Sequence, residues 1–432
     1  MLDDPSRHDE SPEIVSFGCR LNAFESDIIG VHAARAGLVD AVIVNTCAVT
    51  SEAVAQARQA IRKLRRDRPG SRVIVTGCAA QTDPKMFAAM AEVDRVIGND
   101  DKMRPEAWRT ARRVLDGHVS TAPQTPAGKV AVSDIMAVRT SPAAVDLALP
   151  PRPRAYLQIQ NGCDHRCTFC IIPFGRGNSR SVAVDQAIAA ARALVEAGNT
   201  EIVLTGVDLT SYGADLEGQP RLGALVRAML RAIPELRRLR LSSIDSIEAD
   251  ADLLAAIAEE ERLMPHLHLS LQAGDDLVLK RMKRRHSRAD AIAFCDQVRR
   301  LRPDVSFGAD IIAGFPTETE AMFARSLDLI AECDLTFVHA FPYSARPGTP
   351  AARMPQVASA VVKDRARRLR EAGALALRNR LESELGASRA VLIESPTRGR
   401  TEHFIPVAVA GNTPGTVQRL TMSGHDGAML CV

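Results

Sequence analysis

The sequence lacks any long apolar run. No stretch of the 432 residues approaches the roughly 20 consecutive apolar residues that span a bilayer. The N-terminus carries Asp3, Asp4, Asp9 and Glu10 in place of the basic and apolar regions of a signal peptide. Hydrophobic residues make up 46% of the chain and charged residues 25%, as in ordinary globular proteins. We therefore expect a cytoplasmic protein without a membrane partner.

The chain also lacks a strong net charge. Its formal charge of +3 at pH 7 is too small to imply a nucleic-acid partner by itself, so only local patches could mark one. The strongest patch is the run KRMKRRHSR at 280–288. Such a run is often a solvated helix end, but phosphate contacts would be sought there first. The sequence contains neither a Ser-His-Asp pattern nor a phosphate-binding loop, and its ten His show no metal-ligand spacing.

Nine cysteines stand out against these absences. In a chain expected in the cytosol, they favour metal or redox chemistry over disulfides. Six of them fall into two organised sets, whereas Cys295, Cys333 and Cys431 are expected to be buried, inert thiols.

The first set is a C-x3-C-x2-C triplet, Cys163, Cys167 and Cys170, directly after the strand-like run 155–159. Three thiolates in one loop can hold three irons of a cubane and leave the fourth iron open to a small molecule. Ferredoxin clusters need four protein thiolates and structural zinc four ligands, and no fourth Cys or suitably spaced His follows. His165 could be a fourth ligand, but it would close the open iron. A zinc knuckle or a chance cluster of thiols stays as the alternative.

The second set follows three predicted strands. Short apolar runs at 14–17, 41–45 and 72–76 alternate with helical patterns at 22–36 and 51–66, which predicts a parallel sheet in an α/β domain. Cys19, Cys47 and Cys78 come just after these strands, at the edge where open α/β sheets bind ligands. Ordinary packing would not require the Gly that precedes two of them, so a second open-iron cluster is the better interpretation.

A segment rich in Ala, Pro, Ser and Thr, from about residue 115 to 152, is interpreted as a linker or a wrap around a domain edge.

A second series of alternating strand and helix patterns follows this segment. Its predicted strands are 156–160, 201–206, 239–243, 267–272, 307–314 and 337–343, and its predicted helices are 182–197, 222–232, 249–259, 288–301 and 318–331. Six such units predict a barrel or partial barrel with its chemistry at the C-terminal ends of the strands. A long polar helix at 359–384 then leads to apolar runs broken by Gly and Pro, which predict a small β-domain.

The triplet, with Phe169 before its last cysteine, resembles the cluster motif of the radical S-adenosylmethionine (SAM) superfamily. The whole chain resembles the radical SAM methylthiotransferases within it. The motifs that carry this resemblance are GCRLN at 18–22, NTCAVT at 45–50, GCAAQ at 77–81, RG at 176–177 with SRS at 179–181, and LTGV at 204–207. The resemblance implies an α/β protein with an N-terminal parallel-sheet α/β domain (1–118), a linker (119–150), a central radical SAM partial (β/α)6 barrel (151–384) and a small C-terminal all-β TRAM-like domain (385–432).

The resemblance also implies two [4Fe-4S] clusters and SAM. A cluster on Cys163, Cys167 and Cys170 would bind SAM and, once reduced, cleave it to a 5′-deoxyadenosyl radical. A cluster on Cys19, Cys47 and Cys78 would carry the sulfur that is methylated from a second SAM and attached to the substrate. The cofactors supply this reactivity, and the protein supplies position. Candidate SAM-binding residues are Phe169, Thr205, Gly206, Ser243, Gln272 and Ile312, although ordinary strand-end packing explains each of them equally well. Asp310 lies within an apolar strand and needs a partner.

Three subgroups of the family differ in substrate. The motif NTCAVT resembles the subgroup that modifies threonylcarbamoyladenosine in tRNA. We therefore expect methylthiolation of C2 of N6-threonylcarbamoyladenosine at position 37, with the tRNA anticodon stem-loop and a reducing electron donor as partners and a monomer as the assembly. The alternatives are isopentenyladenosine in tRNA, an aspartate of a small-subunit ribosomal protein, or a non-catalytic iron-sulfur carrier. The basic run at 280–288 and the C-terminal domain are expected to grip the RNA.

Overall fold

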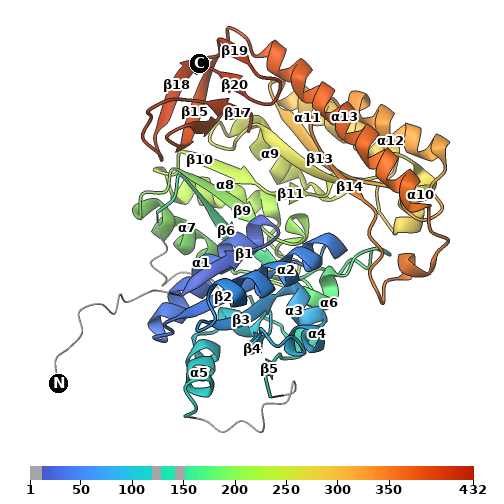
Figure 1. Ribbon diagram of the computed structural model, residues 1–432. Helices are drawn as coiled ribbons and strands as arrows, with labels where there is room; N and C mark the ends of the chain where they lie inside the picture. Colours follow the sequence, from blue (N-terminus) through green and yellow to red (C-terminus); the bar gives the residue numbers. More distant parts are fainter. Residues whose placement is uncertain (1–11, 119–127, 142–150) are drawn as a thin grey trace.

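The computed structural model describes residues 12–118, 128–141 and 151–432 (Figure 1). The acidic N-terminal residues and parts of the expected linker lie outside these ranges. Within them, no helix combines the length and the hydrophobicity needed to cross a bilayer.

The N-terminal unit is a sheet of five parallel strands in the order β1-β2-β3-β4-β5. Its strands are β1 (Glu13–Ser16), β2 (Ala41–Thr46), β3 (Arg72–Gly77), β4 (Arg95–Ile97) and β5 (Val130–Ala131), and its main helices are α1 (Arg20–Arg35), α2 (Ser51–Asp67), α3 (Cys78–Thr82), α4 (Pro84–Ala88) and α5 (Pro105–Leu115). All six residues of β2 are buried, as in a central parallel strand covered by helices on both faces. The predicted α/β domain is confirmed.

Part of the expected linker forms a strand instead. Val130 and Ala131 pair in parallel with β4, and a short 3-10 helix η2 (Ile135–Ala137) follows. Val130 and Val132 pack against the buried cluster of the N-terminal sheet, and Ile135 is buried. A few apolar residues within a polar segment were enough to attach it to the sheet edge. The boundaries at 118 and 151 stay a prediction, because 119–127 and 142–150 lie outside the described residues.

The central unit is the predicted partial barrel, with seven strands in place of six because the third predicted strand is split in two. Two parallel arcs, β10-β9-β6 and β11-β12-β13-β14, follow one another around it. The strands are β6 (Arg154–Gln158), β9 (Glu201–Thr205), β10 (Arg238–Leu241), β11 (Ser243–Ile244), β12 (His266–Gln272), β13 (Ser306–Ala313) and β14 (Leu335–Pro342). The helices around it are α7 (Val184–Glu196), α8 (Leu222–Ala232), α9 (Ala251–Glu259), α10 (Asp276–Met282), α11 (Arg288–Leu301) and α12 (Glu320–Glu332). The third predicted strand is interrupted between β10 and β11, and the short α10 was not predicted.

The barrel is open between β6 and β14, since each of these strands ends its arc. Helix α1 of the N-terminal unit packs against β6 at this gap. A hairpin of β7 (Gln160–Asn161) and β8 (Arg180–Ser181) encloses the cysteine loop and α6 (Ile172–Arg176). The N-terminal unit therefore meets the barrel along one side and at the C-terminal ends of its strands (Figure 1).

Helix α13 (Ser359–Ser383) leads to a six-stranded C-terminal sheet in the order β18-β15-β16-β17-β20-β19. Its strands are β15 (Ser388–Ser395), β16 (Arg398–Arg400), β17 (Pro406–Ala408), β18 (Val417–Thr421), β19 (Gly424–His425) and β20 (Leu430–Cys431). This sheet docks on the N-terminal ends of the barrel strands, because Arg238 donates hydrogen bonds to the carbonyls of Ala390 and Thr401. The predicted all-β C-terminal domain is confirmed, and it forms the floor of the barrel.

Candidate active site

The structure brings Cys19, Cys47 and Cys78 to one edge of the N-terminal sheet. Cys19 caps the start of α1, Cys47 follows β2, and Cys78 is the first residue of α3. Gly18 has a φ of +103°, and a Cβ there would lie 2.7 Å from the Cβ of Cys47. Only glycine allows the Cys19 loop to approach Cys47 so closely. The sheet therefore delivers three thiols from three separate strands to one place.

The second triad lies in the loop between β7 and β8. The amide of Cys163 donates to the carbonyl of Gly177 (3.1 Å), which fixes the start of the loop. In its middle, the amide of Thr168 donates to the carbonyl of Met282, and its carbonyl accepts from Ala351. These bonds hold the loop over the C-terminal ends of the barrel strands, where the sequence predicted the chemistry to be.

The two triads face each other across the interface between the N-terminal unit and the barrel. A Cβ on Gly175 of α6 would lie 3.3 Å from the Cβ of Cys78. Asn99 donates to the carbonyl of Gly175 at 2.7 Å and to Sγ of Cys78 at 3.7 Å. The pKa of Cys170 is raised to about 11, mainly by burial, and Cys78 is close enough to contribute to this rise. Both sets of thiols therefore border the same mouth.

The surroundings of the thiols fit metal clusters. Three sulfurs receive hydrogen-bond donors, from the amide of Val49 to Cys47 (3.5 Å), from Asn99 to Cys78 and from Arg284 to Cys167 (3.8 Å). A thiolate accepts such bonds better than a neutral thiol, and hydrogen bonds to sulfur tune iron-sulfur clusters. Burial raises the pKa of Cys47 to about 11, so this thiol is neutral at pH 7 by itself. A metal would deprotonate it, because coordination removes the proton outright.

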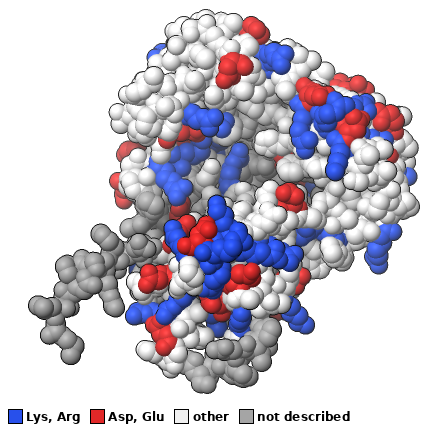
Figure 2. All heavy atoms as spheres, viewed as in Figure 1, with Lys and Arg blue, Asp and Glu red and all other residues white. Residues whose placement is uncertain are grey.

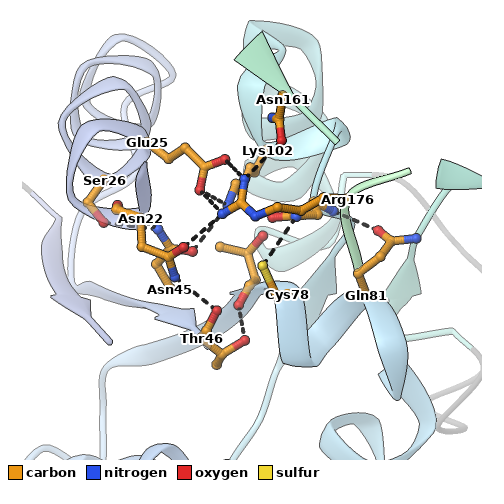
Figure 3. Close-up of polar contacts among 12 residues, drawn as sticks. Asn22, Glu25, Ser26, Asn45, Thr46, Cys78, Gln81, Lys102, Asn161 and Arg176 are labelled. Atoms are coloured by element: carbon orange, nitrogen blue, oxygen red, sulfur yellow. Dashed lines mark hydrogen bonds and ion pairs between the residues drawn. The ribbon is translucent and has the colours of Figure 1, made fainter. Parts of the chain in front are cut away.

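A buried network of charges joins the two units beside Cys78 (Figure 3). Nζ of Lys102 lies 2.6 Å from Glu25, and Arg176 of α6 contacts the same carboxylate at 2.8 and 3.1 Å. Arg176 also donates to Asn22 (2.8 Å), which in turn donates to the carbonyl of Thr46. Burial alone would raise the pKa of Glu25, but the two cations outweigh it and lower this pKa. One carboxylate between two cations leaves an excess positive charge next to the thiols.

His165 is engaged by carboxylates. Its Nε2 lies 2.9 Å from Asp208 and 3.6 Å from Glu248, and Arg285 also contacts Glu248. Hydrogen bonds with Asp208 and Glu248 raise the pKa of His165 to about 10. Arg285 also contacts this Nε2, at 2.5 Å. Because Nε2 is already engaged by Asp208 and Arg285, its surroundings argue against His165 as a fourth ligand.

The basic run at 280–288 is divided between side chains that contact the protein and side chains that stay exposed, so its expected RNA contacts stay a prediction. Arg284 donates to Cys167, to Asp245 (2.7 Å) and to the carbonyl of Ser270 (2.8 Å). His286 is buried, and Arg288 binds the carbonyls of Gly274 and Arg325. Lys280, Lys283 and Arg285 remain exposed. Residues of this run therefore contact the cysteine loop from helix α10 and from the segment that follows it. Sequence periodicity could not reveal this helix, because α10 is only seven residues long.

The candidate SAM-binding residues divide into two groups. A cavity at the mouth is lined by Val49, Thr50, Phe169, Gln272, Asp310, Ile312, Phe341, Pro342, Tyr343 and Ser344. Three of the candidates, Phe169, Gln272 and Ile312, therefore share one cavity with residues that follow Cys47. Thr205, Gly206 and Ser243 lie at the ends of β9 and β11 and do not line it.

The partners of Asp310 are two histidines that the sequence analysis did not single out. Its Oδ1 lies 2.8 Å from Nε2 of His268 and 3.2 Å from Nδ1 of His339. Burial would raise the pKa of Asp310, but the two hydrogen bonds lower it. A sequence signal for these two histidines existed, because His268 and His339 are polar residues within strands, as Asp310 is. Their contact could not be predicted, because it depends on the register of β12, β13 and β14.

Comparisons with known proteins agree with this architecture. Residues 157–330 match the model of the radical SAM superfamily, and residues 12–98 match the uncharacterized protein family UPF0004. A threonylcarbamoyladenosine tRNA methylthiotransferase of Rickettsia prowazekii is 47% identical over 99% of this chain and 98% of its own length. A tRNA-2-methylthio-N(6)-dimethylallyladenosine synthase of Erythrobacter litoralis is 33% identical over 85% of this chain and 83% of its own.

A solved structure of the radical SAM methyltransferase TsrM from Kitasatospora setae is similar in fold. Its TM-score is 0.53 at 17% identity, over 77% of this chain and 67% of that chain. The superfamily implies a [4Fe-4S] cluster and SAM. Full-length similarity, the two facing thiol triads and the partial barrel together place this chain in the family of radical SAM methylthiotransferases.

Proposed function

We propose that this protein methylthiolates C2 of N6-threonylcarbamoyladenosine at position 37 of tRNA. The observation that carries the proposal is the full-length similarity to a threonylcarbamoyladenosine tRNA methylthiotransferase, at 47% identity. Three further relatives with that name are 32 to 34% identical to the chain. The motif Asn45-Thr46-Cys47-Ala48-Val49-Thr50 supports the same subgroup, and Val49 and Thr50 line the cavity at the mouth.

In this proposal each triad holds one [4Fe-4S] cluster. Cys163, Cys167 and Cys170 would hold the cluster that binds SAM, and Cys19, Cys47 and Cys78 the cluster that carries sulfur. When bound, these groups supply a hydrogen-abstracting radical and the sulfur that replaces the hydrogen. The residues of the chain position them: Gly18 lets two thiols approach, Arg284 donates to Cys167, and the Glu25 network fixes the N-terminal unit on the barrel.

The remaining assignments follow from the cavity. Phe169, Gln272 and Ile312 are proposed to contact SAM, because they line the cavity beside the cysteine loop. Thr205, Gly206 and Ser243 are proposed to reach SAM from the ends of β9 and β11. The substrate would be an anticodon stem-loop, whose unpaired bases can be turned out toward a protein. An external electron donor and a monomeric assembly complete the proposal.

Isopentenyladenosine in tRNA is the second candidate substrate, because synthases for its methylthio derivative are 31 to 34% identical to this chain. These identities are lower than the 47% to the Rickettsia prowazekii relative, which disfavours isopentenyladenosine as the substrate. Modification of a ribosomal-protein aspartate and a non-catalytic carrier have no further support.

The proposal is tested with tRNA nucleosides from a strain lacking the gene. Mass spectrometry is expected to show loss of methylthio-threonylcarbamoyladenosine and its recovery on complementation. Complementation with Cys163→Ala or Cys47→Ala is expected to fail, whereas Cys431→Ala, outside both triads, should restore the nucleoside. An unchanged amount of the nucleoside in the deletion strain, with no second enzyme for it, would rule the substrate out.

A further inference from the structure

Arg20, the residue after Cys19, points into the barrel interior. Its guanidinium carbon lies 5.5 Å from the centre of the Phe404 ring, which belongs to the C-terminal floor. No hydrogen bond or ion pair to the Arg20 side chain is present among the described residues, yet the side chain keeps some exposure. Arg20 is therefore a half-buried cation that has no carboxylate partner among the described residues.

The floor beneath Arg20 carries excess positive charge. Glu201 binds Arg238 at 2.8 Å and Arg240 at 3.0 Å, and it also contacts Arg154. Glu394 is shared between Arg154 and Arg400. Four arginines thus share two carboxylates, and three of them, Arg154, Arg240 and Arg400, also lie over the ring of Phe404.

Several donors in this region lack partners. Nη2 of Arg154, Nη1 of Arg240 and Nδ1 of His266 are buried and make no hydrogen bond within the described structure. Arg240 is fully buried, and a buried donor without an acceptor destabilises the folded protein. Burial, followed by the nearby cations including Arg20, lowers the pKa of His266 well below its usual range. These are the properties of a site that an anion would stabilise.

Polar side chains of three barrel strands, Asp310, His268 and His339, form a second part of the proposed site. Asp310, held by His268 and His339, can accept a hydrogen bond from a hydroxyl group, and the exposed ring of His339 leaves room for one. Figure 2 shows the hollow near the middle of this face, bordered by Lys and Arg side chains. Arg20 directly follows Cys19 in the chain, so the candidate anion-binding side chain belongs to the residue next to an N-terminal thiol.

We propose that Arg20, over the positively charged floor at Phe404, binds the carboxylate of the threonyl group on N6 of the substrate base, with Asp310 and His339 facing its hydroxyl. This inference rests on the proposed function and adds the recognition step. Guanidinium and carboxylate form charge-assisted hydrogen bonds, which a neutral side chain such as isopentenyl cannot replace. A site built for a polar group rejects analogues that lack it, because its buried donors are then left unpaired.

The test measures the affinity of the cluster-loaded enzyme for three stem-loop RNAs. They carry threonylcarbamoyladenosine, its uncharged threoninamide counterpart, or unmodified adenosine at position 37. The parent enzyme is expected to prefer the carboxylate over the amide by about ten-fold or more. Arg20→Gln is expected to abolish this preference, Arg20→Lys to keep part of it, and Arg113→Gln, an exposed residue of α5, to keep all of it. Iron content and SAM cleavage check that Arg20→Gln still holds its clusters.

Two results would overturn the inference. Equal affinity of the parent enzyme for the RNA with the carboxylate and the RNA with the amide would show that the enzyme does not recognise the negative charge. A uniform loss of affinity for all three RNAs in Arg20→Gln would show that Arg20 contacts a phosphate instead. The proposed function is judged separately, by whether the parent methylthiolates the first RNA, so the two can fail independently.

Discussion

At the scale of single residues, the site depends on groups that surround the thiols. Glu25 and Lys102 are fully buried, and Arg176 is 2% exposed. Such charges are retained only when they neutralise one another, since removing one partner of a buried set leaves the others without compensation. The surplus positive charge lies where three cysteine thiolates would add negative charge.

The Glu25→Gln variant is predicted to lose about 3–5 kcal/mol of unfolding free energy, because Lys102 and Arg176 would remain buried without a carboxylate. Urea unfolding at pH 7, followed by circular dichroism, measures this loss. Glu106→Gln is the matched control: its carboxylate pairs with Arg109 on the exposed face of α5, and such pairs contribute about 0–1 kcal/mol. Similar losses in both variants would contradict the prediction.

The Gly18→Ala variant is predicted to lose the N-terminal cluster selectively. The added Cβ would lie 2.7 Å from Cys47, at a φ of +103° that disfavours alanine. Anaerobic reconstitution should give about four irons per chain in place of about eight, with SAM cleavage retained at the barrel cluster. In Gly70→Ala the added Cβ meets nothing within 4 Å, so this control should bind iron as the parent does.

At the scale of elements, the floor of the barrel connects three strands through one side chain. Glu201 at the start of β9 pairs with Arg154 on β6 and with Arg238 and Arg240 on β10. Burial would raise the pKa of Glu201, but the three arginines hold it well below its usual range. A carboxyl group with a lowered folded pKa stabilises the protein above its unfolded pKa of about 4.3, and this contribution disappears as the pH falls.

The Glu201→Gln variant is therefore predicted to be less stable than the parent by about 3–5 kcal/mol between pH 5 and 8. This difference should narrow below about pH 4.3, where the unfolded carboxyl group takes up its proton and the parent loses its advantage. Urea unfolding across a pH series measures the difference. Glu235→Gln, on the surface, should track the parent at every pH. A difference that stays constant with pH would contradict the assignment to Glu201.

Sequence patterns predicted most elements because the strands are buried on both faces. Continuous apolar runs mark such strands directly, and the predicted ranges of β2 and β9 differ from the observed ones by one residue at an end. Cysteine spacing likewise indicated both triads. Helix α10 and strand β5 were missed, since each is too short to show a period. The Glu25 network and the partners of Asp310 could not be predicted, because they join residues that only the tertiary fold brings together.

At the scale of the whole molecule, a net charge of +3 hides an uneven distribution. Figure 2 shows a dense group of Lys and Arg side chains directly below the hollow, in the region of α2. Arg62, Lys63 and Arg66 are exposed on this helix, which begins at Ser51, just after the loop of Cys47. A basic surface next to the mouth is suited to the phosphates of a stem whose loop enters the hollow.

Replacing Arg62, Lys63 and Arg66 with Gln is predicted to weaken tRNA binding by roughly ten-fold and to reduce the slope of log affinity against log salt by roughly 2. The loss should be the same for modified and unmodified tRNA, because phosphates carry no base identity. Filter binding at several salt concentrations measures both effects. Arg109→Gln with Arg113→Gln removes two exposed charges from the distant α5, and this control should leave the slope unchanged.

The gap between β6 and β14 means that the barrel depends on the N-terminal unit to cover one of its sides. The helix that packs at this opening is α1, which starts immediately after Cys19. Displacing the N-terminal unit would therefore uncover this side of the barrel and move Cys19 away from it at the same time. One helix thus both covers the opening and presents a thiol, so a substitution that loosens α1 is expected to disturb both.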